Sequence, residues 1–163
     1  MLQAHHLSRI GHRHVLYKQA YDPPQSGQAR MAAFLEAAEK VGIRTTVRFI
    51  DANEKEVLTS EDFSDLTSEG PKPTAIVGWC DRVAERICGS LTALGLSVPG
   101  DVAVVGFDGF HSIFTPRFEL STIRAPWSDI GRKAVSTLIA LGRGETVPAV
   151  TTLPVEFVRG ATT

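Results

Sequence analysis

The chain has 163 residues, of which 43% are hydrophobic and 21% charged, and its formal net charge is −1. This length suits one ordinary domain, and the composition is that of a globular protein rather than a disordered chain or a coiled coil. Because no run of Lys or Arg exceeds two residues, the sequence argues against a self-sufficient nucleic-acid binder.

Short apolar runs rich in β-branched residues alternate with longer segments of helical period. This alternation is typical of βαβ units and predicts an α/β fold, a mainly parallel sheet flanked by helices. Pro23 and Pro24 interrupt the pattern with a loop, since proline donates no backbone hydrogen bond, and Gly42 ends the helix that follows. The elements expected in the first half are a helix over 4–9, a strand at 15–17, a helix over 26–41, a strand over 45–50 and a helix near 60–67.

The second half of the chain continues the alternation. Residues 102–107 form the most apolar run and are the best candidate for a central parallel strand, because such strands are buried on both faces. Pro154 places part of the last strand at an edge or a bulge. The elements expected here are a strand over 74–79, a helix over 82–94, the strand over 102–107, an extended piece over 121–125, a helix after Pro126 and a terminal strand over 151–158.

Polar and aromatic side chains follow several of the predicted strands. In open α/β sheets ligands bind outside the carboxyl ends of the strands, where helix N-termini gather. A carboxylate, an arginine and hydroxyls suit the vicinal hydroxyls of a sugar or nucleoside, and a tryptophan ring can stack on a ring face. The side chains selected by this rule are Ser26, Arg30, Trp79, Cys80, Asp81 and Asp108.

Each of these residues also has a structural interpretation, which the sequence leaves open. Arg30 suits a solvated ion pair on a helix, and Asp108 suits a turn or a helix cap. Trp79 suits the core, where large aromatic side chains usually pack.

Two further groups of residues have the composition of reactive sites but not the spacing. Cys80 in a strand-to-helix turn resembles a nucleophile elbow followed by Asp108 and His111, but the usual final glycine is an arginine, and an acid three residues from a histidine rarely orients its ring. We therefore expect no catalytic residue and no enzyme. His12 and His14 suit a metal pair, but they lack an acidic or thiol ligand beside them, so we expect no metal site.

The chain offers little sign of export or of a cofactor. Its amino terminus lacks the pattern of a secretory signal, and its longest apolar runs are too short to span a bilayer. Cys80 and Cys88 stand eight apart, which is neither a metal-ligand spacing nor a disulfide framework. We expect a cytoplasmic protein with no membrane partner and no cofactor.

Five segments, in order, resemble the LacI/GalR bacterial transcription regulators, whose core is similar to periplasmic sugar-binding proteins. These segments are HLSRIGHRHV (6–15), PTAIV (73–77) with Asp81, LGLSVPGDVAVVGFD (94–108), STIRAPWSDIG (121–131) and LPVEFVR (153–159). The resemblance implies an incomplete type I periplasmic-binding-protein-like effector domain. Residues 1–122 would form its C-terminal subdomain. Residues 123–163 would supply the crossover, a helix of the missing N-terminal subdomain and a terminal strand.

The resemblance also assigns effector contacts. Arg30 and Asp108 match the arginine and the first acid that contact the effector in this family, and Ser26 lies where the family often places a polar contact. Cys80 stands in place of the usual asparagine, and Asp81 matches the acid after it.

Other positions at the implied pocket depart from the family pattern. Gly109 replaces a second acid and Ala125 replaces the usual glutamine, while Trp127 would flank the pocket near the crossover. Together with the cysteine at position 80, these departures remove hydrogen-bonding groups that usually touch a sugar. They indicate one of two alternatives. Either the ligand is less polar or of a different kind, or the response of the regulator to its effector has changed.

By resemblance, the chain is the effector-sensing and dimerisation portion of a LacI-type regulator. Its expected partners are a small sugar-like or nucleoside-like effector and a second copy, paired through the helix over 82–94. Operator DNA would be reached only through a missing helix-turn-helix headpiece, so we expect these residues alone to bind no operator and little or no effector. The alternative function is a solute-binding protein of a sugar transport or receptor system, and a minor alternative is a Cys-dependent hydrolase.

Overall fold

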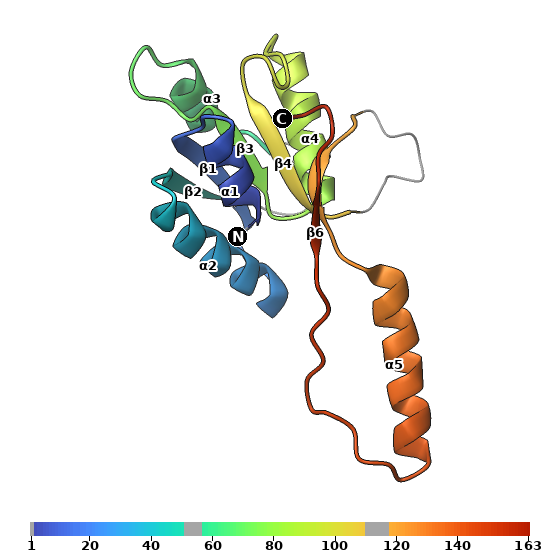
Figure 1. The fold of residues 1–163 in the computed structure, drawn as a ribbon. Helices are drawn as coiled ribbons and strands as arrows, with labels where there is room; N and C mark the ends of the chain where they lie inside the picture. The colour runs from blue at the N-terminus through green and yellow to red at the C-terminus, as the bar shows by residue number, and fades with distance from the viewer. Residues whose placement is uncertain (1, 51–56, 110–117) are drawn as a thin grey trace.

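The computed structural model describes residues 2–50, 57–109 and 118–163. Within these residues six strands form one sheet in the order β2-β1-β3-β4-β5-β6 (Figure 1). Strands β1 to β5 are all parallel, and β6 is antiparallel to β5. The predicted α/β fold with a mainly parallel sheet is therefore confirmed, in the doubly wound arrangement that covers both faces with helices.

The helices and strands follow the predicted order closely. Their bounds are α1 (Leu2–Arg9), β1 (His14–Ala20), α2 (Gln25–Lys40), β2 (Arg44–Ile50), α3 (Ser60–Thr67), β3 (Ala75–Gly78), α4 (Asp81–Ala93), β4 (Ala103–Asp108), β5 (Ser121–Arg124), α5 (Trp127–Gly142) and β6 (Glu156–Val158).

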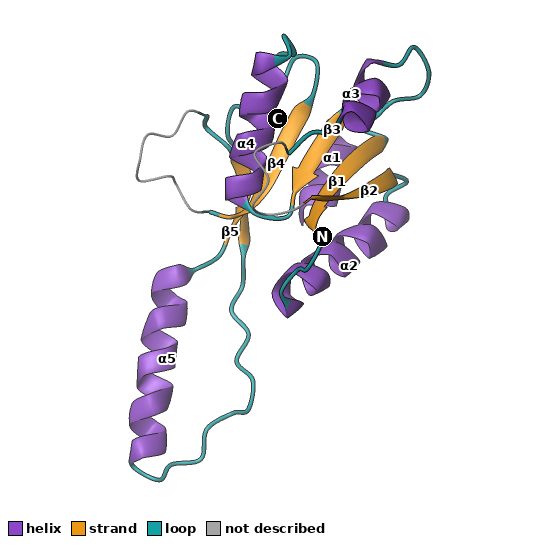
Figure 2. Cartoon of the chain, turned by 180° about the vertical axis from the view of Figure 1, so that it is seen from behind, coloured by secondary structure: helices purple, strands orange, loops and turns teal. Residues whose placement is uncertain are grey.

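Two apolar layers hold the sheet between its helices. Since successive strand residues point to opposite faces, Val15 packs under α1 and α2 whereas Leu16 packs under α3 and α4 (Figures 1 and 2). In the first layer the Tyr17 ring lies 5.2 Å from the Phe34 ring of α2, centroid to centroid. Burial on both sides explains why the central strands β3 and β4 are apolar at almost every position.

A buried ion pair interrupts this apolar pattern. Lys18 Nζ in β1 donates to Asp62 Oδ2 in α3 at 2.5 Å, and both side chains are 0% exposed. Asp62 also closes a capping box with Thr59 at the start of α3. Arg48 of β2 adds contacts to three carboxylates of α3, those of Glu61, Asp62 and Asp65. Helix α3 is thus attached to two strands by charge as well as by apolar packing.

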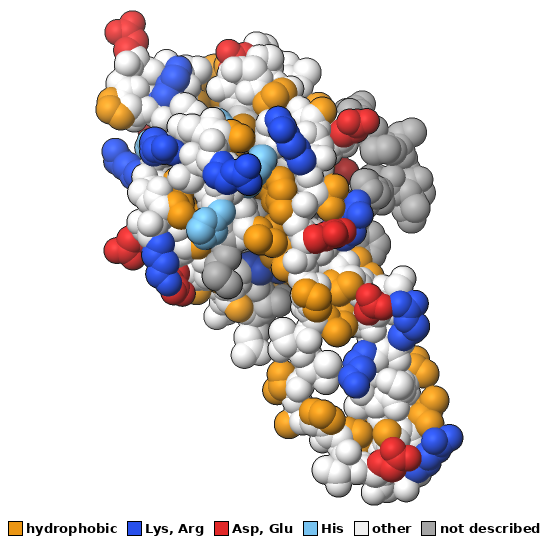
Figure 3. All heavy atoms as spheres, in the orientation of Figure 1, with side chains coloured by type: hydrophobic (Ala, Val, Ile, Leu, Met, Phe, Trp, Pro, Cys, Tyr) orange, Lys and Arg blue, Asp and Glu red, His pale blue; other side chains and the backbone are white. Residues whose placement is uncertain are grey.

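Helix α5 and the segment after it project from the sheet (Figure 1). None of the residues of α5 is buried, and apolar side chains gather on this projecting part of the surface (Figure 3). Strand β6 covers only Glu156–Val158, so the expected strand over 151–158 is wrong for its first five residues. The reason is that β5 ends at Arg124, which already pairs with Glu156 and leaves the preceding residues without a neighbouring strand.

Across the described ranges, no helix has the length together with the apolar content that crossing a bilayer requires.

Three histidines near the amino terminus are expected to make stability depend on pH. Burial is the largest cause that lowers the pKa of each, and each ring shares a hydrogen bond with a threonine hydroxyl. A pKa below the unfolded value of 6.5 means that the neutral ring contributes stability above pH 6.5, which is lost as the pH falls through the lowered folded pKa. The pairs are His6 with Thr163, His12 with Thr74, and His14 with Thr46.

We therefore expect the melting temperature to fall as the pH is lowered from neutrality through 6.5. The His12→Gln variant should show a smaller fall, because burial is the cause that lowers the His12 pKa. Thermal unfolding followed by circular dichroism at several pH values measures this, with the exposed His5→Gln as the matched control. Identical pH dependence in the wild-type and His12→Gln proteins would contradict the assignment.

Candidate functional site

An arginine and an aspartate meet at the carboxyl ends of the central strands. Arg30, in the second turn of α2, places Nη2 3.0 Å from Oδ1 of Asp108 at the end of β4. Arg30 Nη1 also donates to the backbone carbonyl of Trp79, just after β3, at 3.2 Å. Two neighbouring parallel strands and the helix that follows a third therefore converge on this edge, which we call the rim.

The rim contains an aromatic residue that the sequence did not single out. The guanidinium carbon of Arg30 lies 4.0 Å from the centre of the Phe107 ring, a cation–π distance. Its place at the end of an apolar strand was a signal only for burial, so nothing local marked it for the rim. The Arg30 and Asp108 side chains are 19% and 22% exposed, so the pair is partly shielded yet remains accessible to a small molecule.

Asp108 is held in an unusual environment and conformation. Burial raises the pKa of its carboxyl group above the ordinary value, and the neighbouring Arg30 opposes that shift. Its φ of 131° lies in a region that side-chain-bearing residues rarely adopt. Its backbone carbonyl accepts hydrogen bonds from Trp127 Nε1 at 2.7 Å and from the Ala125 amide at 3.2 Å. A strained residue with contacts at both ends is characteristic of functional sites.

Two substitutions of Asp108 should measure this strain. Asp108→Gly and Asp108→Ala both remove the carboxylate, but only glycine adopts a positive φ without a steric penalty. We expect the glycine variant to be more stable than the alanine variant by about 1–2 kcal/mol, the reverse of the usual order within a strand. Urea unfolding of the two variants provides the comparison. Equal stabilities, or a more stable alanine variant, would mean that the backbone is not strained.

The residue after Asp108 has no room for a side chain. Gly109 has a φ of 69°, and a Cβ built on it would lie 2.6 Å from the backbone Cα of Arg124. A side chain at this position would therefore overlap β5, and the second acid of the family pattern does not fit the backbone found here.

The remaining predicted residues lie around the rim in different ways. Ser26 is exposed in the first turn of α2, and Trp127 begins α5 with 43% of its surface exposed. Trp79 packs between both apolar layers, and its buried Nε1 has no hydrogen-bond partner among the described residues. Asp81 is almost fully buried and accepts a hydrogen bond of 2.5 Å from Thr122 of β5. The tryptophan and the aspartate thus have clear packing roles.

Neither alternative constellation acquires a working geometry within the described residues. Cys80 caps α4 in a buried position, and burial raises the pKa of its thiol, whereas a nucleophilic cysteine needs a lowered one. His111, the third member of the hydrolase hypothesis, lies outside the described residues. His12 and His14 face different threonines, Thr74 and Thr46, rather than one shared point.

The mainly parallel sheet between two layers of helices, with an arginine–aspartate pair where the central strands end, is that of a periplasmic-binding-protein-like α/β domain. The chain belongs to the periplasmic binding protein-like domain family, whose model matches residues 4–163, and within it to the LacI/GalR regulators. The resemblance of the sequence to the LacI/GalR regulators is thus confirmed.

Individual relatives agree with this family. The HTH-type transcriptional repressor PurR of Glaesserella parasuis serovar 5 is 30% identical over 135 residues, 82% of this chain and 40% of the relative. The arabinose metabolism transcriptional repressor of Geobacillus stearothermophilus is 32% identical over 142 residues, 83% of this chain and 38% of the relative. The solved lac repressor dimer bound to operator and the anti-inducer ONPF is similar at a TM-score of 0.80 and 26% identity, over 99% of this chain and 56% of that chain. The chain thus spans about two fifths of the length of the curated relatives it matches.

Proposed function

We propose that this chain is the effector-sensing and dimerisation portion of a LacI-type transcription regulator in the cytoplasm, without enzymatic activity. The observation that carries the proposal is the Arg30–Asp108 pair, with 3.0 Å between nitrogen and oxygen and both side chains accessible at the strand ends. Such a pair offers several donors on one side and acceptors on the other, which is what a ligand with neighbouring hydroxyls requires.

The proposed effector is a sugar or a nucleoside-like molecule. Arg30 would donate to ligand oxygens and Asp108 would accept from ligand hydroxyls, while the exposed face of Trp127 and the hydroxyl of Ser26 would border the pocket. Cys80 and Asp81 lie beneath them at the start of α4, where their burial suits a supporting role. Support comes from one relative whose name refers to arabinose metabolism and, separately, from the similar lac repressor structure, which carries the anti-inducer ONPF.

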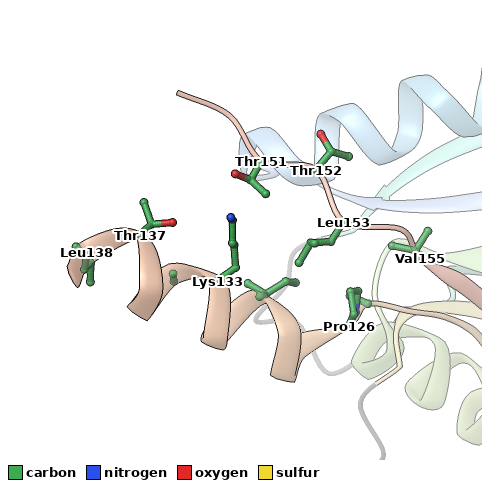
Figure 4. A pocket seen from close by; sticks show the side chains of 11 residues that line it. Pro126, Lys133, Thr137, Leu138, Thr151, Thr152, Leu153 and Val155 are labelled. Atoms are coloured by element: carbon green, nitrogen blue, oxygen red, sulfur yellow. The ribbon is translucent and has the colours of Figure 1, made fainter. Parts of the chain in front are cut away.

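We further propose that the chain contributes to two lobes. Residues 1–122 would form the carboxy-terminal lobe, and residues 123–163 would supply the crossover, a helix of the other lobe and the final strand. A groove of about 690 Å³ separates α5 from residues 151–155 and is lined mainly by apolar side chains, including Ile130, Leu138 and Leu153 (Figure 4). Apolar lining of that extent favours cover by packed protein.

Regulation would follow from a change of lobe angle. An effector that binds one angle better than the other shifts the population between them, and in a dimer this changes the spacing of two DNA-binding headpieces. The lac repressor structure is a dimer bound to operator, which supports a homodimer and operator binding by the complete regulator. In our proposal α4 forms the dimer contact and a separate headpiece binds the operator. A hollow beside the carboxy-terminal end of α4, with Leu94 47% exposed, suits such a contact.

Titration calorimetry of a protein that carries both lobes tests the proposal. The panel comprises pentoses, hexoses, galactosides, purine bases and nucleosides. We expect saturable binding of one chemical group and a matching change in operator affinity in a gel shift. Binding without any change in operator affinity would instead indicate a solute-binding protein.

A further inference from the structure

One carbonyl oxygen joins the rim to the projecting helix. The indole Nε1–H of Trp127, the first residue of α5, donates to the backbone carbonyl of Asp108 at 2.7 Å. The amide of Ala125 donates to the same oxygen at 3.2 Å. Both donors belong to the segment that leads from β5 into α5, so this oxygen is a shared attachment point for the rim and the crossover.

The conformation of Asp108 depends on contacts at both of its ends. Its carboxylate is paired with Arg30 on the rim side, and its carbonyl is bound by Trp127 on the crossover side. Between them the backbone has a φ of 131°, which persists only where surrounding contacts impose it. Loss of the contact at the carboxylate would therefore let the peptide unit relax and would reorient the carbonyl.

Neighbouring contacts restrict where that relaxation can occur. A Cβ on Gly109 would overlap Arg124, so the residue after Asp108 is closely packed against β5. Arg124 is in turn paired with Glu156 across β5 and β6 at 3.3 Å. The amide of Trp127 donates to the carbonyl of Ala125 at 2.9 Å, which makes a tight turn around Pro126. The indole and the first turn of α5 should consequently move together.

We propose that Trp127 is a positioning residue that couples the state of the Arg30–Asp108 ion pair to the direction of α5. This inference rests on the proposed function, because an effector that competes for either partner is what changes the pair. Helix α5 has no buried residue, so contacts at its first turn have a large share in setting its direction. Through the hydrogen bond from the Trp127 indole to the Asp108 carbonyl, a change in the ion pair alters the direction of α5.

Nuclear magnetic resonance of the chain tests the coupling without a ligand. The sequence has two tryptophans, so a ¹⁵N-labelled sample has two indole resonances, and Trp79→Phe assigns them. We expect Arg30→Met to shift the Trp127 indole resonance and to speed its hydrogen exchange severalfold. Arg132→Met, which breaks an ion pair within α5 itself, is the matched control and should leave the indole unchanged. An unshifted Trp127 indole in Arg30→Met overturns the proposal.

A second measurement tests whether the direction of α5 depends on the Trp127 indole. Trp127→Phe keeps an aromatic ring but removes the donor, so residual dipolar couplings of α5 amides should decrease relative to those of the sheet. Couplings identical to wild type overturn the proposal. Should Arg30→Met fail to fold, Asp108→Asn removes the charge with almost no change of shape, and the same indole criterion applies. Neither measurement uses an effector, so their failure leaves the proposed function standing, whereas failed effector binding with intact coupling removes only the proposed function.

Discussion

Replacing Asp62 with alanine is expected to lower the free energy of unfolding by about 3–5 kcal/mol, because a buried charge is left without its partner. Lys18 Nζ and Asp62 Oδ2 are 2.5 Å apart, and neither side chain has any exposed surface. The substitution also removes the capping box with Thr59 at the start of α3. A loss of this size is a large part of the stability of an ordinary domain.

Urea unfolding of a double variant tests whether the stability lost in Asp62→Ala comes from the unpaired charge of Lys18. Lys18→Met with Asp62→Leu should recover most of the lost stability, since an apolar pair of similar size often replaces a buried ion pair at little cost. Asp65→Ala, at a partly exposed partner of Arg48, is the control and should cost no more than about 1 kcal/mol. A double variant as unstable as Asp62→Ala would contradict the interpretation.

Replacing Arg30 with methionine is expected to weaken effector binding about 10- to 150-fold, because hydrogen bonds to charged groups contribute about 1.5–3 kcal/mol. Methionine keeps the apolar stem but removes the guanidinium that pairs with Asp108 and lies over Phe107. Titration calorimetry with the panel sugar or nucleoside that binds the wild-type protein measures the loss. Arg132→Met on the exposed surface of α5 should retain wild-type affinity. Retained affinity in Arg30→Met would place the effector elsewhere.

Local sequence patterns were sufficient for most of the fold. Residues 102–107 are identifiable as a central strand because burial on both faces demands apolar side chains at successive positions. The sequence predicts too long a terminal strand, since the length of β6 depends on how far β5 continues beside it rather than on its own residues. Arg30 and Asp108 are predictable from the sequence because the carboxyl ends of parallel strands share an edge, a topological rule that requires only the order of the elements.

The sequence by itself therefore determined the order of the elements, the parallel sheet, the family and the residue types at the strand ends. Only the tertiary structure decided which distant groups touch: Lys18 with Asp62, the guanidinium of Arg30 with Phe107, and the indole of Trp127 with the carbonyl of Asp108. The physical reason is that periodicity and turn chemistry act over a few neighbouring residues. Contacts between residues far apart in the chain depend instead on how the layers pack and on a backbone angle, such as the φ of Asp108, that residue type alone does not specify.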